Sequence, residues 1–293
     1  MRHSRRRLLT AGIAAPVLAV SAPAVHAASR PRIGIAFGSG SRHGLVHVGI
    51  IKALAEAGLR PQVVTGTSAG AIAGALWASG LEWDRIRQAA GEISWLEGGR
   101  LSFDLGLLSN ESVRRLVRER TAGRPMEDWP IRFGAVAADF ATGERVLLSS
   151  GDPGDAVAAS ASMPVLYAPV TIGGRGLVDG ALVEPVPIRA ARELGAEVVI
   201  AVDVAFRPAE EPPGSVLDAP FQAMHILVNR LIEEQIGEAD FAIRLNVHHL
   251  FAAPDTDRRL LAAGERAVRE RWPAIQAALQ APAGGPPRKG CAA

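Results

Sequence analysis

One serine lies between two glycines where a β-branched run changes to a pattern of small residues. Residues 63–74 read VVTGTSAGAIAG, so that Gly66 and Gly70 flank Ser68. In a G-x-S-x-G turn from strand to helix, the serine hydroxyl is exposed as a nucleophile and the glycines let neighbouring elements pack closely. A chain of this composition contains ~0.2 such matches by chance, so the strand before it and the helix after it give the pattern its weight. The alternative is a tight turn that merely holds a hydroxyl.

A second glycine-rich segment, residues 38–44 (GSGSRHG), follows another apolar run. A glycine-rich loop that opens a helix exposes backbone N–H groups and suits an anion. If the strands before the two glycine-rich turns are parallel neighbours, their carboxyl ends meet at one sheet edge, and amides beside a serine form an oxyanion hole. Nucleotide binding is the rival interpretation. However, Leu45 stands where a P-loop has lysine, and residues 63–66 (VVTG) lack the acid of a dinucleotide-binding fingerprint.

Asp179 is the candidate partner of this serine. It ends the apolar run Leu177-Val178 and precedes Gly180, so that a turn presents it. A carboxylate accepts a proton from an alcohol well only when its pKa is raised, and burial against an apolar strand raises it. The alternative is an aspartate that bonds its own backbone, which is the commoner role of Asp-Gly. No cluster of His, Cys, Asp or Glu has the spacing of metal ligands, so we expect neither a metal nor a cofactor.

The elements that must position these residues alternate between strand and helix. Residues 32–37 and 62–65 are expected strands, and residues 46–57 and 69–79 are expected helices, which indicates a parallel sheet covered by helices. Two hairpins are expected around Thr142-Gly143 and Gly173-Gly174, with strands at 132–138, 145–149, 165–172 and 176–178. The remaining expected elements are helices at 186–194, 219–236 and 257–279, a buried strand at 198–204 and a loop at 208–214.

Six segments together resemble the patatin-like phospholipases, close to the bacterial branch related to neuropathy-target esterase. The likeness runs from about residue 32 to residue 264, and the order and spacing of the segments match together. The segments are GSGSRHGLVHVGI (38–50), GTSAGAIAGAL (66–76), AADFATGE (137–144), SASMPVLYAPV (160–170), LVDGALVEPVP (177–187) and GAEVVIAVDV (195–204). Two positions depart from the family pattern: His43 stands where an arginine or lysine is usual, and Glu184 stands where asparagine is frequent.

The resemblance implies an α/β fold, a three-layer α/β/α sandwich with a mainly parallel central sheet. It implies a Ser-Asp dyad without a catalytic histidine, in which Ser68 is the nucleophile, Asp179 is the base and Gly180 belongs to the motif of the base. The residues of the implied oxyanion hole are Ser39, Gly40, Ser41 and Ala69. The implied reaction is hydrolysis of a fatty-acyl ester, in a phospholipid or lysophospholipid, through an acyl-enzyme on Ser68.

Two alternatives remain open from the residues. One is an α/β-hydrolase with a Ser-Asp-His triad, although in that class the elbow normally follows several strands rather than the second. Its candidate histidines are His225, His248 and His249. The other is a non-catalytic lipid-binding protein that kept the scaffold, against which the intact Ser68 and Asp179 argue. His47, Asp139 and Asp203 are expected to have structural roles, and His43 either borders the active site or is a solvated loop histidine.

The N-terminal residues 1–27 have the layout of a signal peptide. Basic residues precede an uncharged apolar stretch, and small residues flank His26 where a signal peptidase cleaves. Ser4-Arg5-Arg6-Arg7-Leu8-Leu9 resembles the twin-arginine export signal, so we expect a periplasmic protein.

Residues 28–281 are expected to form one acyl hydrolase domain. Residues 282–293 are expected to be a disordered tail.

The balance of charged residues limits the kinds of partner that the protein can bind. Without the four arginines of residues 1–27, 28 basic residues stand against 30 acidic ones, which does not suit a nucleic-acid-binding protein. We expect a lipid or fatty-acyl ester as substrate and peripheral membrane contact through apolar residues, while the oligomeric state stays open. A basic patch formed by Arg114, Arg115, Arg118 and Arg120 is the alternative mode of interface binding. The expected pocket walls, for which a buried core is an equal explanation, are Trp77, Trp83, Trp95, Leu96, Leu105 and Leu107.

Overall fold

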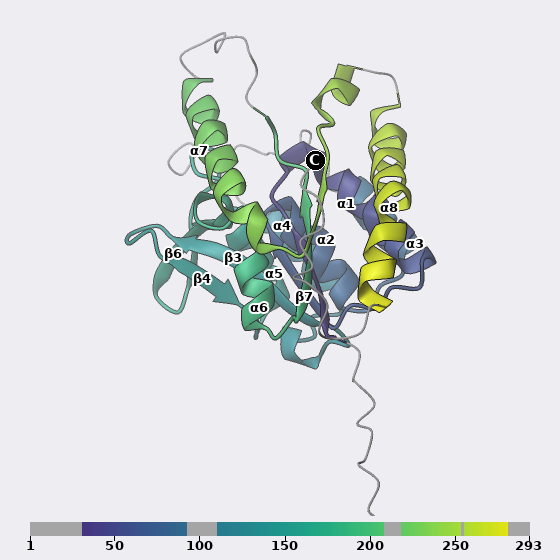
Figure 1. Cartoon of the computed structure of the whole chain (residues 1–293). Coiled ribbons are helices and arrows are strands. Elements are labelled where there is room, and N and C mark those ends of the chain that lie inside the picture. The colour runs from purple at the N-terminus through teal and green to yellow at the C-terminus, as the bar shows by residue number, and fades with distance from the viewer. Residues whose placement is uncertain (1–30, 93–109, 208–217, 253–254, 281–293) are drawn as a thin grey trace, which may run out of the picture. The chain divides into compact units, whose positions relative to one another are not determined.

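The computed structural model describes residues 31–92, 110–207, 218–252 and 255–280 (Figure 1). The predicted signal peptide, the predicted disordered tail and the loop at 208–214 lie outside these residues. Four expected pocket-wall residues also lie outside them: Trp95, Leu96, Leu105 and Leu107.

A mostly parallel sheet forms the centre of the fold, with strand order β5-β6-β3-β2-β1-β7-β8 and β4 paired to β3. Strands β1, β2, β3, β7 and β8 are parallel, whereas β4 and β6 run antiparallel to β3, and β5 antiparallel to β6. The strands are β1 (Ile33–Phe37), β2 (Val63–Thr67), β3 (Arg132–Asp139), β4 (Arg145–Leu148), β5 (Val170–Ile172), β6 (Arg175–Asp179), β7 (Val198–Asp203) and β8 (Phe241–Arg244).

Helices cover both faces of this sheet (Figure 1). They are α1 (Leu45–Glu56), α2 (Ala69–Ala78), α3 (Trp83–Glu92), α4 (Glu111–Arg120), α5 (Pro153–Ser160), α6 (Ile188–Glu193), α7 (Ala219–Gln235) and α8 (Thr256–Gln280). Successive side chains of a strand point to opposite faces. On β1, Ile35 and Phe37 join the core formed with α1, α2 and α8, whereas Ala36 joins the core formed with α6 and α7. The predicted three-layer α/β/α sandwich is therefore confirmed.

The neighbouring parallel strands that the site requires are present. β1 pairs with β2 in a register that sets Phe37 opposite Gly66, so the two glycine-rich turns leave the sheet at the same edge. Both expected hairpins also form, as β3–β4 and β5–β6. Strand β5 starts at Val170 instead of 165, because prolines at 164 and 169 and a positive φ of 76° at Val165 prevent regular pairing there.

Helices α3, α4 and α5 and strand β8 were not expected from the sequence. Helices α3 and α4 follow the elbow helix in the chain, and each has an amphipathic pattern with a few buried residues. Helix α2, in contrast, is buried along all ten of its residues. Among the described helices, none is both long enough and apolar enough to cross a membrane.

Candidate active site

Ser68 occupies a strained turn between β2 and α2. Its backbone has φ 56° and ψ −122°, a conformation that non-glycine residues rarely adopt. A Cβ on Gly70 would lie 2.2 Å from the carbonyl oxygen of Phe37, and a Cβ on Gly66 would lie 2.4 Å from Cα of Ala71. Both flanking positions must therefore be glycine, since any side chain would collide with the backbone. The turn has the geometry that the G-x-S-x-G pattern predicts.

Asp179 reaches the serine from the end of β6. Its carboxylate accepts one hydrogen bond from the Ala181 amide at 2.9 Å and another from the hydroxyl of Ser68. Burial raises the pKa of Asp179 from its ordinary 3.8 to about 6, although both hydrogen bonds act in the opposite direction. The Asp179 side chain thus bonds the backbone of its own turn and also presents a buried carboxylate to Ser68. Gly180 is required because a Cβ there would lie 2.2 Å from the carbonyl oxygen of Val136.

The glycine-rich loop keeps two amides available beside Ser68. The Gly38 amide donates to Val202 O at 2.8 Å, and the Ser39 amide donates to Pro185 O at 2.7 Å. Within the described part of the chain, the amides of Gly40 and Ser41 make no hydrogen bond. Ser39 lines the pocket, but its amide is bonded to Pro185, so the loop amides left to donate to a ligand are those of Gly40 and Ser41.

The Ala69 amide adds a third donor. It is the first amide of α2, and the first amides of a helix have no partner within that helix. Ala69 is not among the residues that line the pocket in which Ser68 lies.

One pocket brings the predicted site residues together. Its volume is about 450 Å³, including space open to solvent, and its lining includes Ser39, Gly40, Ser41, Ser68 and Asp179. The remaining wall is mainly apolar and comes from the segment after α5, the turn after β6, the end of β7 and helix α7. These wall residues are Met163, Ala181, Leu182, Ala205, Phe206, Met224, His225 and Val228. This composition suits an apolar ligand with a polar reacting group.

The prediction that Trp77 and Trp83 form the pocket wall is wrong. Trp77 is buried against Phe37, with ring centroids 6.0 Å apart, because the whole of α2 lies inside the core. Trp83 begins α3, and Lys52 lies over its ring. Sequence reasoning missed the wall on α7, where Met224 and Val228 lie one helical turn apart. That spacing predicts an apolar face of a helix. It does not predict whether this face packs in the core or lines a cavity.

Two histidines hold the glycine-rich loop instead of entering the pocket. The ring Nδ1–H of His43 donates to the carbonyl of Val204 at 2.7 Å, and the Nε2–H of His47 donates to the carbonyl of Gly38 at 2.9 Å. Complete burial lowers the pKa of His47 to about 4, so it is neutral near pH 7. The expected structural role of His47 is confirmed. His43, at the position where the family has a basic residue, anchors the loop to the end of β7.

Of the three alternative histidines, one lies in the pocket. His225 on α7 lines it and packs on Phe206, and burial lowers the pKa of His225. His248 packs edge-on against Phe206 with ring centroids 4.6 Å apart, and His249 is exposed. The carboxylate of Asp179 is the side chain that bonds the Ser68 hydroxyl.

The other acidic candidates are structural. Asp139 accepts from the Thr142 amide at 3.0 Å and pairs with Arg175, which stabilises the β3–β4 hairpin. Asp203 is fully buried and pairs with Arg244 at 3.1 Å. Both expected structural roles are confirmed.

Glu184 caps a helix. Its Oε1 accepts from the amides of Arg189 and Ala190 at 2.7 and 3.2 Å, at the N-terminus of α6, and its Oε2 pairs with Arg145 at 3.2 Å. A buried acid near a helix N-terminus compensates unpaired amides and the positive end of the dipole. This role accounts for a glutamate where the family often has asparagine.

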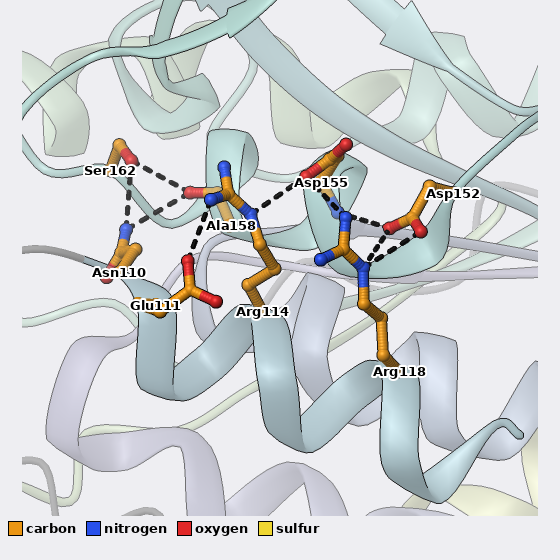
Figure 2. Close-up of polar contacts among 8 residues, drawn as sticks. All are labelled: Asn110, Glu111, Arg114, Arg118, Asp152, Asp155, Ala158 and Ser162. Atoms are coloured by element: carbon orange, nitrogen blue, oxygen red, sulfur yellow. Dashed lines mark hydrogen bonds and ion pairs between the residues drawn. The ribbon is translucent and has the colours of Figure 1, made fainter. Parts of the chain in front are cut away.

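Three of the four arginines of the suggested basic patch are neutralised by ion pairs. Arg114 pairs with Asp155 at 2.8 Å, and Arg118 pairs with Asp152 at 2.9 Å, which joins α4 to α5 (Figure 2). Arg120 pairs with Glu92. These charges connect elements of the fold, so they do not form the free patch that was considered.

Ser68 is strained at a strand-to-helix turn and is bonded to a buried aspartate on an α/β/α scaffold. These features define a protein with a nucleophile elbow. Residues 35–192 match the family described as Patatin-like phospholipase, and this match covers more than half of the chain. The chain belongs to that family, and the resemblance seen in the sequence is confirmed.

Individual relatives agree with this assignment. An uncharacterized NTE family protein of Mycobacterium bovis is 32% identical over 184 residues, which cover 61% of this chain and 51% of that protein. Lysophospholipase nte1 of Emericella nidulans is 29% identical over 191 residues, 62% of this chain but 12% of that protein. The chain thus spans about half the length of the first relative.

A solved structure shares the fold. The crystal structure of VipD from Legionella pneumophila matches with a TM-score of 0.55 and 12% identity, covering 82% of this chain and 66% of that one.

Proposed function

We propose that this protein is a serine acyl hydrolase that cleaves fatty-acyl esters with a Ser68–Asp179 dyad. The observation that carries the proposal is the hydrogen bond from the Ser68 hydroxyl to the buried carboxylate of Asp179, in a mainly apolar pocket beside the loop amides of Gly40 and Ser41. Membership of the patatin-like phospholipase family supports it independently.

The chemistry follows from these contacts. Ionised Asp179 accepts the proton of Ser68 as Oγ attacks the ester carbonyl, and the tetrahedral oxyanion accepts hydrogen bonds from the amides of Gly40, Ser41 and Ala69. The leaving alcohol takes the proton from Asp179, and the acyl group stays on Ser68. Asp179 then removes a proton from the water that attacks the acyl-enzyme. Asp179 gives this proton to Ser68 Oγ as the bond to the acyl group breaks, which releases the fatty acid and restores the serine hydroxyl and the carboxylate. A pKa of about 6 keeps Asp179 ionised near pH 7 and still basic enough to act.

The proposed substrate is a lipid ester, either a phospholipid or a lysophospholipid. The apolar pocket wall supports an acyl chain as ligand. The name of the lysophospholipase relative supports the lysophospholipid in particular. Exposed apolar side chains near the pocket, Leu182, Ile226 and Leu227, support peripheral contact with a lipid surface.

A fluorophosphonate probe tests the nucleophile. We expect mass spectrometry to find one adduct, on Ser68, and Ser68→Ala to lose both the adduct and the hydrolysis of a chromogenic ester. Ser79→Ala is the matched control, since Ser79 is a buried serine at the other end of α2 that donates to Leu76 O at 2.8 Å. An adduct on another residue of folded protein, or full hydrolysis by Ser68→Ala, would overturn the proposal. The latter would favour a lipid-binding protein with a contaminating activity.

We further propose that residues 1–27 direct the protein through the twin-arginine route to the periplasm, and that residues 28–281 act there as one domain. The arginine pair at 5 and 6 and the small residues at 25–27 support this. Replacing Arg5 and Arg6 by lysine should leave precursor in the cytoplasm, whereas the parent sequence should yield a mature N-terminus at Ala28. Equal export of both proteins would exclude the twin-arginine route.

A further inference from the structure

The residues that end α5 bond the backbone on both sides of the dyad. The Oγ of Ser160 accepts a hydrogen bond from the amide of Ser68 at 3.0 Å. Two residues later, the carbonyl of Ser162 accepts from the amide of Asp179 at 2.9 Å. One short segment, residues 160–162, thus contacts both the proposed nucleophile and the proposed base, which lie on different strands.

The direction of the Ser160 hydroxyl is determined by its second bond. It donates to the carbonyl of Val136 on β3 at 2.6 Å, so its lone pairs face the amide of Ser68. Ser160 is completely buried, and water cannot replace it. The Ser68 amide is also buried, and the residue has a strained φ of 56°. A strained conformation persists only where surrounding contacts hold it, and Ser160 supplies such a contact.

Helix α4 supports this segment from outside (Figure 2). Nδ2 of Asn110, at the start of α4, donates to the carbonyl of Ala158 at 3.1 Å and to the Oγ of Ser162 at 2.9 Å. The ion pairs of Arg114 and Arg118 with acids of α5 add further links between the two helices. The end of α5 is therefore held on a second side, away from the pocket.

We propose that Ser160 is a positioning residue, whose hydroxyl holds the backbone of Ser68 so that its Oγ stays in hydrogen-bond contact with Asp179. The inference rests on the proposed acyl hydrolase function. It adds a side chain that does not touch the substrate but sets the geometry of the dyad. Loss of the hydroxyl would leave the buried Ser68 amide without a partner and let the strained turn relax.

A loss of positioning has a signature in the pH profile. The hydrogen bond from Ser68 lowers the pKa of Asp179, so that breaking the contact raises this pKa further above about 6. The other titratable groups on neighbouring elements do not share this direction. His225 on α7 lines the same pocket, and burial lowers its pKa, whereas loss of the contact with Ser68 raises that of Asp179. Asp139 on β3 is paired with Arg175, and Glu184 is paired with Arg145.

The test compares Ser160→Ala, Ser160→Thr, Ser160→Cys, Ser68→Ala and the control Ser79→Ala with the parent protein on a soluble ester. For Ser160→Ala we expect kcat to fall about 100-fold, because a small displacement of a reacting group costs that much. KM should stay within about threefold, because the substrate pocket is intact. The acid limb of the kcat profile should move to higher pH. Ser160→Thr, which keeps the hydroxyl, should recover most of kcat, and Ser79→Ala should match the parent.

Each outcome of this test supports or overturns the positioning role of Ser160. Parent-like kcat and an unshifted acid limb in folded Ser160→Ala would overturn the positioning role while Ser68-dependent hydrolysis stands. Hydrolysis that survives in Ser68→Ala would overturn the proposed function and this inference together. If circular dichroism shows that Ser160→Ala is unfolded, Ser160→Cys decides in its place: a lower kcat with the acid limb moved upward supports the role, and a parent-like profile overturns it.

Discussion

At the scale of single residues, the proposed dyad depends on one carboxyl whose burial destabilises the folded protein. Asp179 is 3% exposed, and the groups that lower its pKa are the Ala181 amide and the Ser68 hydroxyl, which together do not offset its burial. The ionised form is therefore less favourable in the folded protein than in the unfolded chain. The same burial that suits Asp179 to its proposed role as base lowers the stability of the fold at neutral pH.

Asp179→Asn should abolish hydrolysis and stabilise the protein at neutral pH. The carboxyl is protonated in both states below its ordinary pKa of 3.8, so it costs nothing there, and the cost grows until the pH passes about 6. Relative to the parent, the free energy of unfolding of Asp179→Asn should rise by about 3 kcal/mol at pH 8 and by about 1 kcal/mol at pH 4.5. Urea unfolding at the two pH values measures this difference.

The control for that experiment is Asp139→Asn, which should have the opposite sign. Hydrogen bonds from Arg175 and backbone amides lower the pKa of Asp139 to about 2, so its ionised form stabilises the fold above pH 4. Asp139→Asn should therefore be less stable than the parent at pH 8. An equal change for Asp179→Asn at both pH values would contradict the burial of an ionised carboxylate.

Substitution of histidines separates the dyad from a triad. His225→Ala, His248→Ala and His249→Ala should each keep kcat within about tenfold of the parent, whereas Asp179→Asn should lose about 1,000-fold or more, as expected for a general base. His249 is exposed and serves as the matched control for His225, which lines the pocket. If His225→Ala is as inactive as Ser68→Ala in the ester assay, the triad is correct.

At the scale of elements, two glycine-rich turns leave neighbouring parallel strands and face each other. The elbow requires Gly66 and Gly70, since β1, β2 and α2 approach too closely for a side chain. The loop before α1 is held at several points, including the amide of Ser39 and the rings of His43 and His47. These contacts hold the loop through groups other than the amides of Gly40 and Ser41. Those two amides therefore have no hydrogen-bond partner among the described residues.

Gly70→Ala should disrupt the elbow. A Cβ there would lie 2.2 Å from the carbonyl oxygen of Phe37 and 2.5 Å from that of Gly38, so β1 and α2 would have to separate. We expect a loss of about 3 kcal/mol or more in the free energy of unfolding, and no probe labelling of Ser68. Gly91→Ala on α3 is the control: no atom lies within 4 Å of its Cβ position, and alanine should stabilise the helix by up to about 1 kcal/mol. Unfolding of both variants by urea distinguishes steric collision from a general intolerance of alanine.

At the scale of the whole molecule, the proposed contact with a lipid surface should depend on exposed apolar side chains rather than on charge. Residues 28–293 carry nearly balanced charge, and Arg114, Arg118 and Arg120 are engaged in ion pairs. Exposed Ile226 and Leu227 lie on α7, the same helix that lines the pocket with Met224 and Val228. Binding to a lipid surface should therefore resemble burial of apolar area.

Hydrolysis of medium-chain esters and lysophospholipids should depend weakly on salt. Between 50 and 300 mM NaCl, kcat/KM on zwitterionic lysophospholipid should change by less than about threefold, because free charges do not govern the encounter. Ile226→Ser together with Leu227→Ser should weaken activity on micelles but not on a soluble short-chain ester. A steep loss with salt, accompanied by a loss of activity in Arg115→Ala, would instead indicate binding through a basic surface.

Local sequence determined much of this protein. The β-branched runs, the helical spacing and the glycine positions predicted β1, α1, β2, α2, α8 and both hairpins close to their observed bounds, apart from the start of β5. They also placed Ser68 in a strand-to-helix turn and Asp179 at a strand end, because short-range sterics and periodicity decide such features. The same patterns did not predict α3, α4, α5 and β8.

Only the tertiary structure decided which groups meet. The contact of Ser160 with Ser68 joins residues 92 positions apart, and that of His43 with Val204 joins residues 161 apart. The pocket wall on α7, the occupied amide of Ser39 and the paired arginines of α4 likewise depend on segments distant in the chain. Periodicity identifies which face of a helix is apolar, but the packing of distant elements decides whether that face lines a core or a pocket. Burial, and with it the raised pKa of Asp179, is a property of the packed whole.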